Sequence, residues 1–247
     1  MTTHPLITSA IQTLEDPNTP SVVERIAVRV VVEAVETGVL PGASAGVELV
    51  WAWIKRHPSD EPWGAGINAI DNERVRADVL DVLRRGDSGS GLIPVAFTML
   101  EGAGHVMHVG DELLADLVER YSSGPFLWAV ASLIARVQET RGVAPELLLA
   151  TRDRWAASAS PEARQQAAHL FVHLGDVDLA FAETMLADDF VAVRVAMADS
   201  LADLAEHAAP ARPLLGGRLV AERHPAVRAA LLRALAAIED EMPQARS

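Results

Sequence analysis

A segment of about thirty residues recurs in the C-terminal half of this chain. Val193-Arg194-Val195-Ala196 aligns with Val227-Arg228-Ala229-Ala230, 34 residues further on. A weaker copy, Pro161-Glu162-Ala163-Arg164, precedes the first by 30 residues. Repeats of this length are typical of architectures in which each unit buries its apolar face against the next. The repeat therefore favours a fold built from stacked supersecondary units.

Each repeat has a helical pattern. Half of the residues are hydrophobic, and they return at helical spacing from end to end, without a long segment that alternates with period two. Alanine and leucine, which favour helix, are abundant. Proline and glycine breakers divide the chain into about thirteen predicted helices, at 5–14, 21–37, 43–56, 72–85, 89–103, 110–121, 124–138, 144–156, 161–173, 176–187, 190–206, 211–222 and 225–240. The predicted fold class is all-α.

Fainter copies of the repeat lie upstream, at Glu73-Arg74-Val75-Arg76 and at Pro20 to Arg25. Short connections between helices make neighbours in sequence neighbours in space. We therefore expect a single α-solenoid domain over residues 1–247, made of about six antiparallel helix pairs. Its repeats are irregular over 1–157 and clearer over 158–240.

The repeat also carries an acid followed by an arginine six residues later, as in Asp188 and Arg194, and again in Glu222 and Arg228. With these residues the chain resembles the HEAT-repeat family, in particular the short bacterial repeats related to phycobilisome lyases. The resemblance covers residues 160–240 best and implies a right-handed superhelix whose second helices line a concave face. It implies no particular activity. The arginine fork can bond the acid of its own turn or of the next, which gives the pair a structural role.

Composition excludes several functions. The chain has no cysteine, which rules out disulfides, thiolate nucleophiles and cysteine-ligated metals. Its net charge of −13 has the wrong sign for a protein that coats nucleic acid. The most apolar window, 38–54, is too short and too broken to span a bilayer, and the N-terminus does not read as a signal peptide. We expect a bacterial, cytoplasmic protein without a membrane or nucleic-acid partner.

The repeat register predicts a polar row across three second helices. Asp199 and Asp203 lie off the apolar stripe of helix 190–206. Shifted by 30 residues they correspond to His169 and His173, and shifted by 34, Asp199 corresponds to Arg233. Neighbouring helix axes lie about 8–10 Å apart, a distance that side chains can bridge. We therefore expect these five side chains to share one exposed face.

Three interpretations of this row remain open. Two histidines opposite two aspartates could hold a metal, although the His-Glu dipeptides of the di-iron HEAT-fold hydroxylases are missing. His169, His173, Asp199 and Asp203 could instead serve as catalytic acids and bases. The third interpretation, which we adopt, is a solvated or partner-binding face, with Arg233 among the binding residues. No metal site and no cofactor are predicted, since phosphate-loop, dinucleotide, G-x-S-x-G and H-E-x-x-H motifs are all lacking.

Two further groups are candidates for binding. His105 and His108 lie beside Asp111 in a glycine-flanked stretch, which reads as a surface turn with Asp111 capping the next helix. Trp51 and Trp63 flank a short cationic run, where aromatic rings could stack a planar ligand. HEAT-like DNA glycosylases use tryptophans in a basic groove, but that constellation has no match here. Core packing is the structural alternative for Trp51.

Two functions are therefore expected. The first is a non-catalytic scaffold whose concave face binds a protein or peptide partner, of basic character because the chain is acidic. The alternative is an enzyme of a specialised pathway, a lyase, isomerase or cyclase that acts on a small apolar molecule with His/Asp acid–base chemistry. A DNA glycosylase ranks below both. The missing catalytic motifs favour the scaffold.

Overall fold

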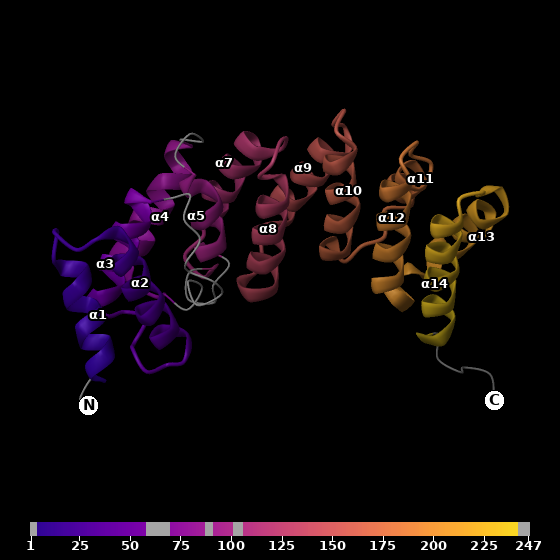
Figure 1. The fold of residues 1–247 in the computed structure, drawn as a ribbon. Helices are drawn as coiled ribbons and strands as arrows, with labels where there is room; N and C mark the ends of the chain where they lie inside the picture. Colours follow the sequence, from indigo (N-terminus) through magenta and orange to yellow (C-terminus); the bar gives the residue numbers. More distant parts are fainter. Residues whose placement is uncertain (1–3, 58–69, 87–90, 101–105, 242–247) are drawn as a thin grey trace. The chain divides into compact units, whose positions relative to one another are not determined.

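The computed structural model describes residues 4–57, 70–86, 91–100 and 106–241 (Figure 1). Within these ranges it contains thirteen α-helices, two 3₁₀ helices and no strand, so the all-α prediction is confirmed for the described chain. Most helices begin and end within three residues of the predicted positions. Helix α9, for example, was expected at 144–156 and spans Pro145–Ala156.

Local sequence signals set the helix ends. The side chain of Asn72 accepts hydrogen bonds from the backbone N–H groups of Arg74 and Val75, and so caps α4 (Glu73–Arg85). That helix ends at Gly86, whose φ of +65° lies in the left-handed region that glycine adopts readily. Ser160 caps α10 (Pro161–Leu170) through the N–H of Ala163, with proline at the first helical position.

The chain divides into two compact units. The first unit comprises residues 1–120 with 132–142, and the second comprises 121–131 with 143–247. Helix α8 (Leu127–Arg141) contributes residues to both. The single domain expected over 1–247 stays a prediction.

In the first unit, α1 (Pro5–Glu15) packs on α2 (Ser21–Glu36) and on α3 (Ala45–Arg56). Helix α3 also contacts α2 and α4, and α4 contacts α5 (Leu92–Leu100). The same unit holds α7 (Asp111–Tyr121) up to Arg120. Its core consists of fully buried aliphatic and aromatic side chains, among them Val28, Val31, Val47, Trp53, Ile54, Val79, Leu83, Phe97 and Leu114.

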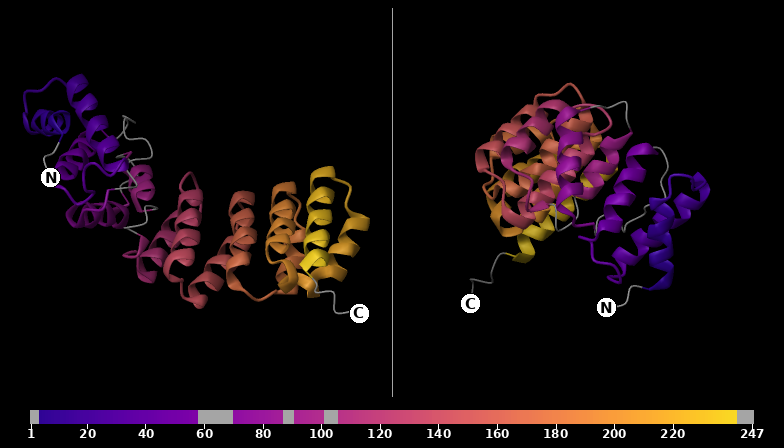
Figure 2. Two further views of the ribbon diagram at one scale, coloured as in Figure 1. Left: turned by 90° about the horizontal axis from the view of Figure 1, so that it is seen from below. Right: turned by 90° about the vertical axis from the view of Figure 1, so that its left-hand side faces the viewer.

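In the second unit, helices pair and the pairs lie next to one another. Helix α9 packs on α10, α11 (Leu179–Leu186) on α12 (Val191–Asp203), and α13 (Arg212–Ala221) on α14 (Pro225–Glu241). The second helix of each pair also contacts the next, α10 with α12 and α12 with α14, and these three lie side by side (Figures 1 and 2). Their shared core includes Phe171, Met197, Leu201, Leu215, Val227, Leu231 and Ile238.

Two predicted helices end three residues early, and a 3₁₀ segment follows each of them. The helix expected at 161–173 stops at Leu170 and continues as a 3₁₀ turn, Phe171–Leu174, which Gly175 ends at a φ of +76°. The helix expected at 190–206 stops at Asp203, and a 3₁₀ segment, Ala205–Ala211, follows. Pro210 lies inside that segment and has no N–H for an α-helical hydrogen bond.

Candidate functional site

Three arginines, Arg164, Arg194 and Arg228, bond the turns of the second unit. We call them the arginine ladder, and each arginine with the groups that it bonds is one rung. Arg164 donates through Nε to Asp188 Oδ2 at 2.6 Å and through a terminal nitrogen to Oδ1 at 3.1 Å. Its other terminal nitrogen donates to the carbonyl oxygens of Ser158 and Ala159 in its own turn. The fork therefore joins the turn before α10 to the turn before α12.

The next rung repeats this arrangement. Arg194 forms a fork with Glu222, at 3.0 and 3.3 Å, and donates to the carbonyls of Asp188 and Asp189. Arg228 donates to the carbonyls of Leu219 and Glu222. The arginine thus bonds carbonyls of its own turn, and in the first two rungs also the acid of the next turn. This holds the second helices in register.

The acids of the ladder are held in their ionised form. Burial alone would raise the pKa of Asp188, but hydrogen bonds from Arg164 and the Phe190 N–H, with the charges of Arg164 and Arg194, outweigh it and lower the pKa. Burial also acts to raise the pKa of Glu222. There the backbone N–H groups of His224 and Arg223, together with Arg194, produce a net lowering.

A row of polar side chains crosses the helices that this ladder holds. Arg233 on α14 donates to Asp199 Oδ1 on α12 at 2.7 Å, across 34 residues of sequence. His169 on α10 lies at the surface, and the carboxylates of Asp199 and Asp203 are close enough to act on its imidazole. We call His169, Asp199, Asp203 and Arg233 the polar strip. The hydrogen bond between Asp199 and Arg233 joins two positions that the repeat register relates, whereas the binding and catalytic roles of these residues stay predictions.

The imidazole of His169 is biased towards its neutral form. Partial burial lowers its pKa, and the negative charges of Asp199 and Asp203 oppose that change without cancelling it. Gln165 lies one turn earlier on α10, with its side-chain nitrogen 3.5 Å from Nε2 of His169. At neutral pH, therefore, the strip presents a neutral imidazole, two carboxylates and a guanidinium.

His173 lies after the end of α10. It is half-buried in the 3₁₀ turn Phe171–Leu174, which advances by about three residues per turn. The helix predicted over 161–173 ends at Leu170, so the two histidines do not lie on one continuous α-helix, and the role of His173 in the polar row stays a prediction.

Small apolar residues flank the strip. Ala192 on α12 is exposed and Val195, one turn later, is half-buried. Ala226, Ala229 and Leu232 are exposed on α14, the last at 52%. Short side chains leave the backbone of these helices open to close approach by another chain. Sequence reasoning singled out the charged residues and did not anticipate this apolar border.

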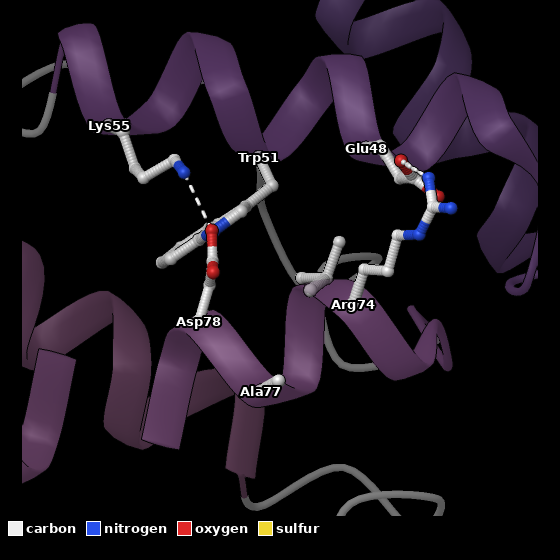
Figure 3. Close-up of a pocket in the computed structure, with 7 residues that line it drawn as sticks. Glu48, Trp51, Lys55, Arg74, Ala77 and Asp78 are labelled. Carbon is white, nitrogen blue, oxygen red and sulfur yellow. Dashed lines mark hydrogen bonds and ion pairs between the residues drawn. The ribbon is translucent and has the colours of Figure 1, made fainter. Parts of the chain in front are cut away.

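A second candidate site lies in the first unit. A depression of about 430 Å³ is lined by residues of α3 and α4, namely Glu48, Trp51, Lys55, Arg74, Val75, Ala77 and Asp78 (Figure 3). Trp51 is only 2% exposed, and its indole N–H donates to Asp78 Oδ2 at 3.2 Å. Its ring therefore forms part of the pocket wall and offers little free face for stacking. The sequence drew attention to Trp51 but not to its partners on α4.

The remaining predicted site residues have mixed outcomes. Trp63 and His105 lie outside the described residues. His108 is exposed in the turn before α7. Asp111 is the first residue of α7 and accepts a hydrogen bond from Arg141 at 2.6 Å, an ion pair that spacing did not predict.

No protein-family model and no curated protein matches this chain. Among the described residues, His, Asp and Glu side chains do not form a group of three or more that could hold a metal ion. Within the same residues, no helix is both long and apolar enough to cross a membrane. The cytoplasmic location stays a prediction.

Proposed function

We propose that this chain is a HEAT-like α-solenoid scaffold that binds a protein or peptide partner of basic character along the polar strip of its second unit. The repeat register supports the proposal, since it brings equivalent positions of α10, α12 and α14 together. The arginine ladder supports it as well, because repeated turn-to-turn bonds are a way to build a long, regular surface from short units.

The Asp199–Arg233 ion pair carries the proposal. It joins corresponding positions of two neighbouring second helices, and His169 occupies the corresponding position on a third. A partner that crosses the three helices would meet an imidazole, a carboxylate and a guanidinium in succession. Such an ordered row allows a partner to be recognised by its charge pattern.

Charge favours a basic partner. The whole chain carries a net charge of −13, which speeds the approach of cations over a long range. On the strip, Arg233 compensates Asp199, while Asp203 is exposed on the last turn of α12. A lysine or arginine of the partner would pair with Asp203, and the apolar border would receive its small apolar side chains.

Binding is favoured over the acid–base alternative by the state of Asp199. A general base needs a carboxylate free to accept a proton, whereas Asp199 is already engaged by a guanidinium at 2.7 Å. Chemistry on a small apolar molecule therefore stays a second hypothesis, with His169 as its base.

The test is peptide selection on the full chain. Peptides selected from a random display library should be enriched in lysine and arginine, and Asp199→Ala with Asp203→Ala should weaken their binding about tenfold or more. Glu146→Ala with Glu183→Ala is the matched control, because it removes the same charge from exposed positions on α9 and α11. If both double variants lose the same affinity, the loss comes from the change in net charge and the strip is not the binding site. Unchanged binding in Asp199→Ala with Asp203→Ala would refute the proposal as well.

A further inference from the structure

The depression between α3 and α4 has a charge arrangement of its own, separate from the polar strip. Helix α3 contributes Glu48, Trp51 and Lys55, three and seven residues apart, so they lie along one face of the helix. Helix α4 contributes Arg74 and Asp78, one turn apart. Figure 3 shows an ion pair at each end of the depression, with the ring of Trp51 beside the Lys55–Asp78 pair.

At one end of the depression α3 contributes the positive side chain and α4 the negative one, and at the other end the signs are reversed. Lys55 donates to Asp78 at 2.6 Å at one end, and Arg74 donates to Glu48 at 3.3 Å at the other. The lining therefore has two positive and two negative side chains and no net charge. A zwitterionic ligand would add its ammonium group to the Lys55–Asp78 pair and its carboxylate to the Arg74–Glu48 pair, so that the occupied depression as a whole stays neutral.

Unused hydrogen-bonding capacity differs between the ends. Lys55 and Trp51 both donate to the same oxygen of Asp78, Oδ2, and within the described part of the chain Oδ1 accepts no hydrogen bond. Both oxygens of Glu48 are engaged, by Asn72 and Arg74. The carboxylate that can accept an ammonium group is therefore that of Asp78.

Arg74 provides the complementary group. Its side chain is 83% exposed, and its bond to Glu48 uses one terminal nitrogen of a fork that has five N–H donors. Exposed ion pairs of this kind contribute little to stability, so sharing the guanidinium with a ligand costs little. A guanidinium fork matches a carboxylate in geometry.

Helix geometry sets the distance between the two charges of the ligand. At about 1.5 Å per residue, Arg74 and Asp78 are about 6 Å apart along α4, and Glu48 and Lys55 are about 10 Å apart along α3. An extended peptide spans about 3.3–3.6 Å per residue, so two or three residues cover this range. The charges of a single amino acid are too close together.

We propose that this depression binds a short peptide of two or three residues with free termini, its carboxylate on Arg74 and its ammonium group on Asp78. The buried ring of Trp51 and the buried side chain of Val75 form a fixed wall against which the peptide lies. The indole N–H holds the Asp78 carboxylate in place. A volume of about 430 Å³ falls in the range of small-molecule sites.

Titration of the full chain with trialanine and dialanine, followed by NMR through the indole N–H of Trp51, tests this inference. We expect saturable shifts with both peptides and at least tenfold weaker binding of N-acetyl-trialanine, trialanine amide and free alanine. These comparisons use the unaltered chain, so they do not depend on the folding of a variant. Equal affinity for blocked and free peptides, or no saturable shift, would overturn the proposal.

Substitution of Arg74 and of Asp78 tests the two proposed contacts with the peptide termini separately. Arg74→Gln and Asp78→Asn should each weaken trialanine binding about tenfold or more, whereas Arg84→Gln and Asp81→Asn should leave it within about twofold. Both control residues lie on the same helix and do not line the depression. If the control variants lose as much affinity as the pocket variants, trialanine binds elsewhere and the assignment is wrong.

Discussion

Arg194 and Glu222 form a two-bond ion pair between neighbouring turns of the second unit, and their side chains are only 11% and 5% exposed. The arginine also donates to two backbone carbonyls of its own turn. One side chain thus satisfies a buried carboxylate and two turn carbonyls at once. Its position depends on the repeat, because Arg164 bonds Asp188 in the same way one rung earlier.

Truncation of Arg194 should destabilise the second unit strongly. Arg194→Ala removes two charge-assisted hydrogen bonds from the buried Glu222, which keeps Arg218 at 3.6 Å and the backbone N–H groups of Arg223 and His224. The expected loss in the free energy of unfolding is about 1.5–3 kcal/mol. Arg233→Ala is the control: it also breaks an interhelical ion pair, but an exposed one, worth about 0–1 kcal/mol. Urea denaturation followed by circular dichroism measures both. Similar losses in the two variants would mean that the ladder does not support the turns.

Acid should weaken the same rung. The folded pKa of Glu222 lies below its unfolded value, so the pair contributes its full stability above the unfolded pKa. As pH falls through about 4, the unfolded state binds more protons than the folded state and stability decreases. The difference in unfolding free energy between the native chain and Glu222→Gln should therefore shrink from pH 7 to pH 3. A difference that stays constant with pH would contradict the ionised state of this carboxyl.

The helices could be predicted from the sequence because their ends depend on local signals. Ser160-Pro161 starts α10 and Gly86 ends α4, and both act through the backbone of a few residues. The Asp199–Arg233 pair could be predicted for a related reason, since stacked repeats turn a fixed sequence offset into proximity. The 3₁₀ turn that contains His173 could not be predicted in this way, because the breaker Gly175 marks where the turn ends and not where α10 changes into it.

The depression between α3 and α4 could not be predicted from the sequence, for a different reason. Glu48 and Lys55 pair with Arg74 and Asp78 across a long connection between helices, where no repeat offset relates the partners. Helical spacing shows which residues of α3 share a face, but it does not show which helix covers that face. The role of Trp51 changes accordingly, from a candidate stacking surface to a buried wall that orients Asp78.

Truncation of two leucines in the second unit should change the free energy of unfolding by very different amounts. Leu201 on α12 is 0% exposed and Leu232 on α14 is 52% exposed. Leu201→Ala should lower the free energy of unfolding by about 2–5 kcal/mol, because it removes buried apolar surface and leaves a cavity. Leu232→Ala should change it by about 0.5 kcal/mol or less. Thermal unfolding of the two variants checks this, and equal changes would place Leu201 outside the core.

The ionisation of His169 provides a direct probe of the polar strip. Partial burial lowers its pKa while Asp199 and Asp203 raise it, so removing either negative charge should lower the pKa further. Asp199→Asn should have this effect, and Glu183→Gln, an exposed change on α11, should not. NMR titration of the imidazole carbon-bound protons, assigned with His169→Gln, measures the midpoint.

The lowered pKa of His169 should also make the free energy of unfolding depend on pH. A folded pKa below the unfolded value of about 6.5 means that folding favours the neutral imidazole, so this contribution is complete above that pH and decreases as pH falls. His169→Gln should remove that part of the pH dependence. If the midpoint of His169 stays the same or rises in Asp199→Asn, then that carboxylate does not act on the imidazole and the strip is not continuous across α10 and α12. A midpoint above the unfolded value in the native chain would mean that the carboxylates outweigh burial, and the predicted sign of the pH dependence would be wrong.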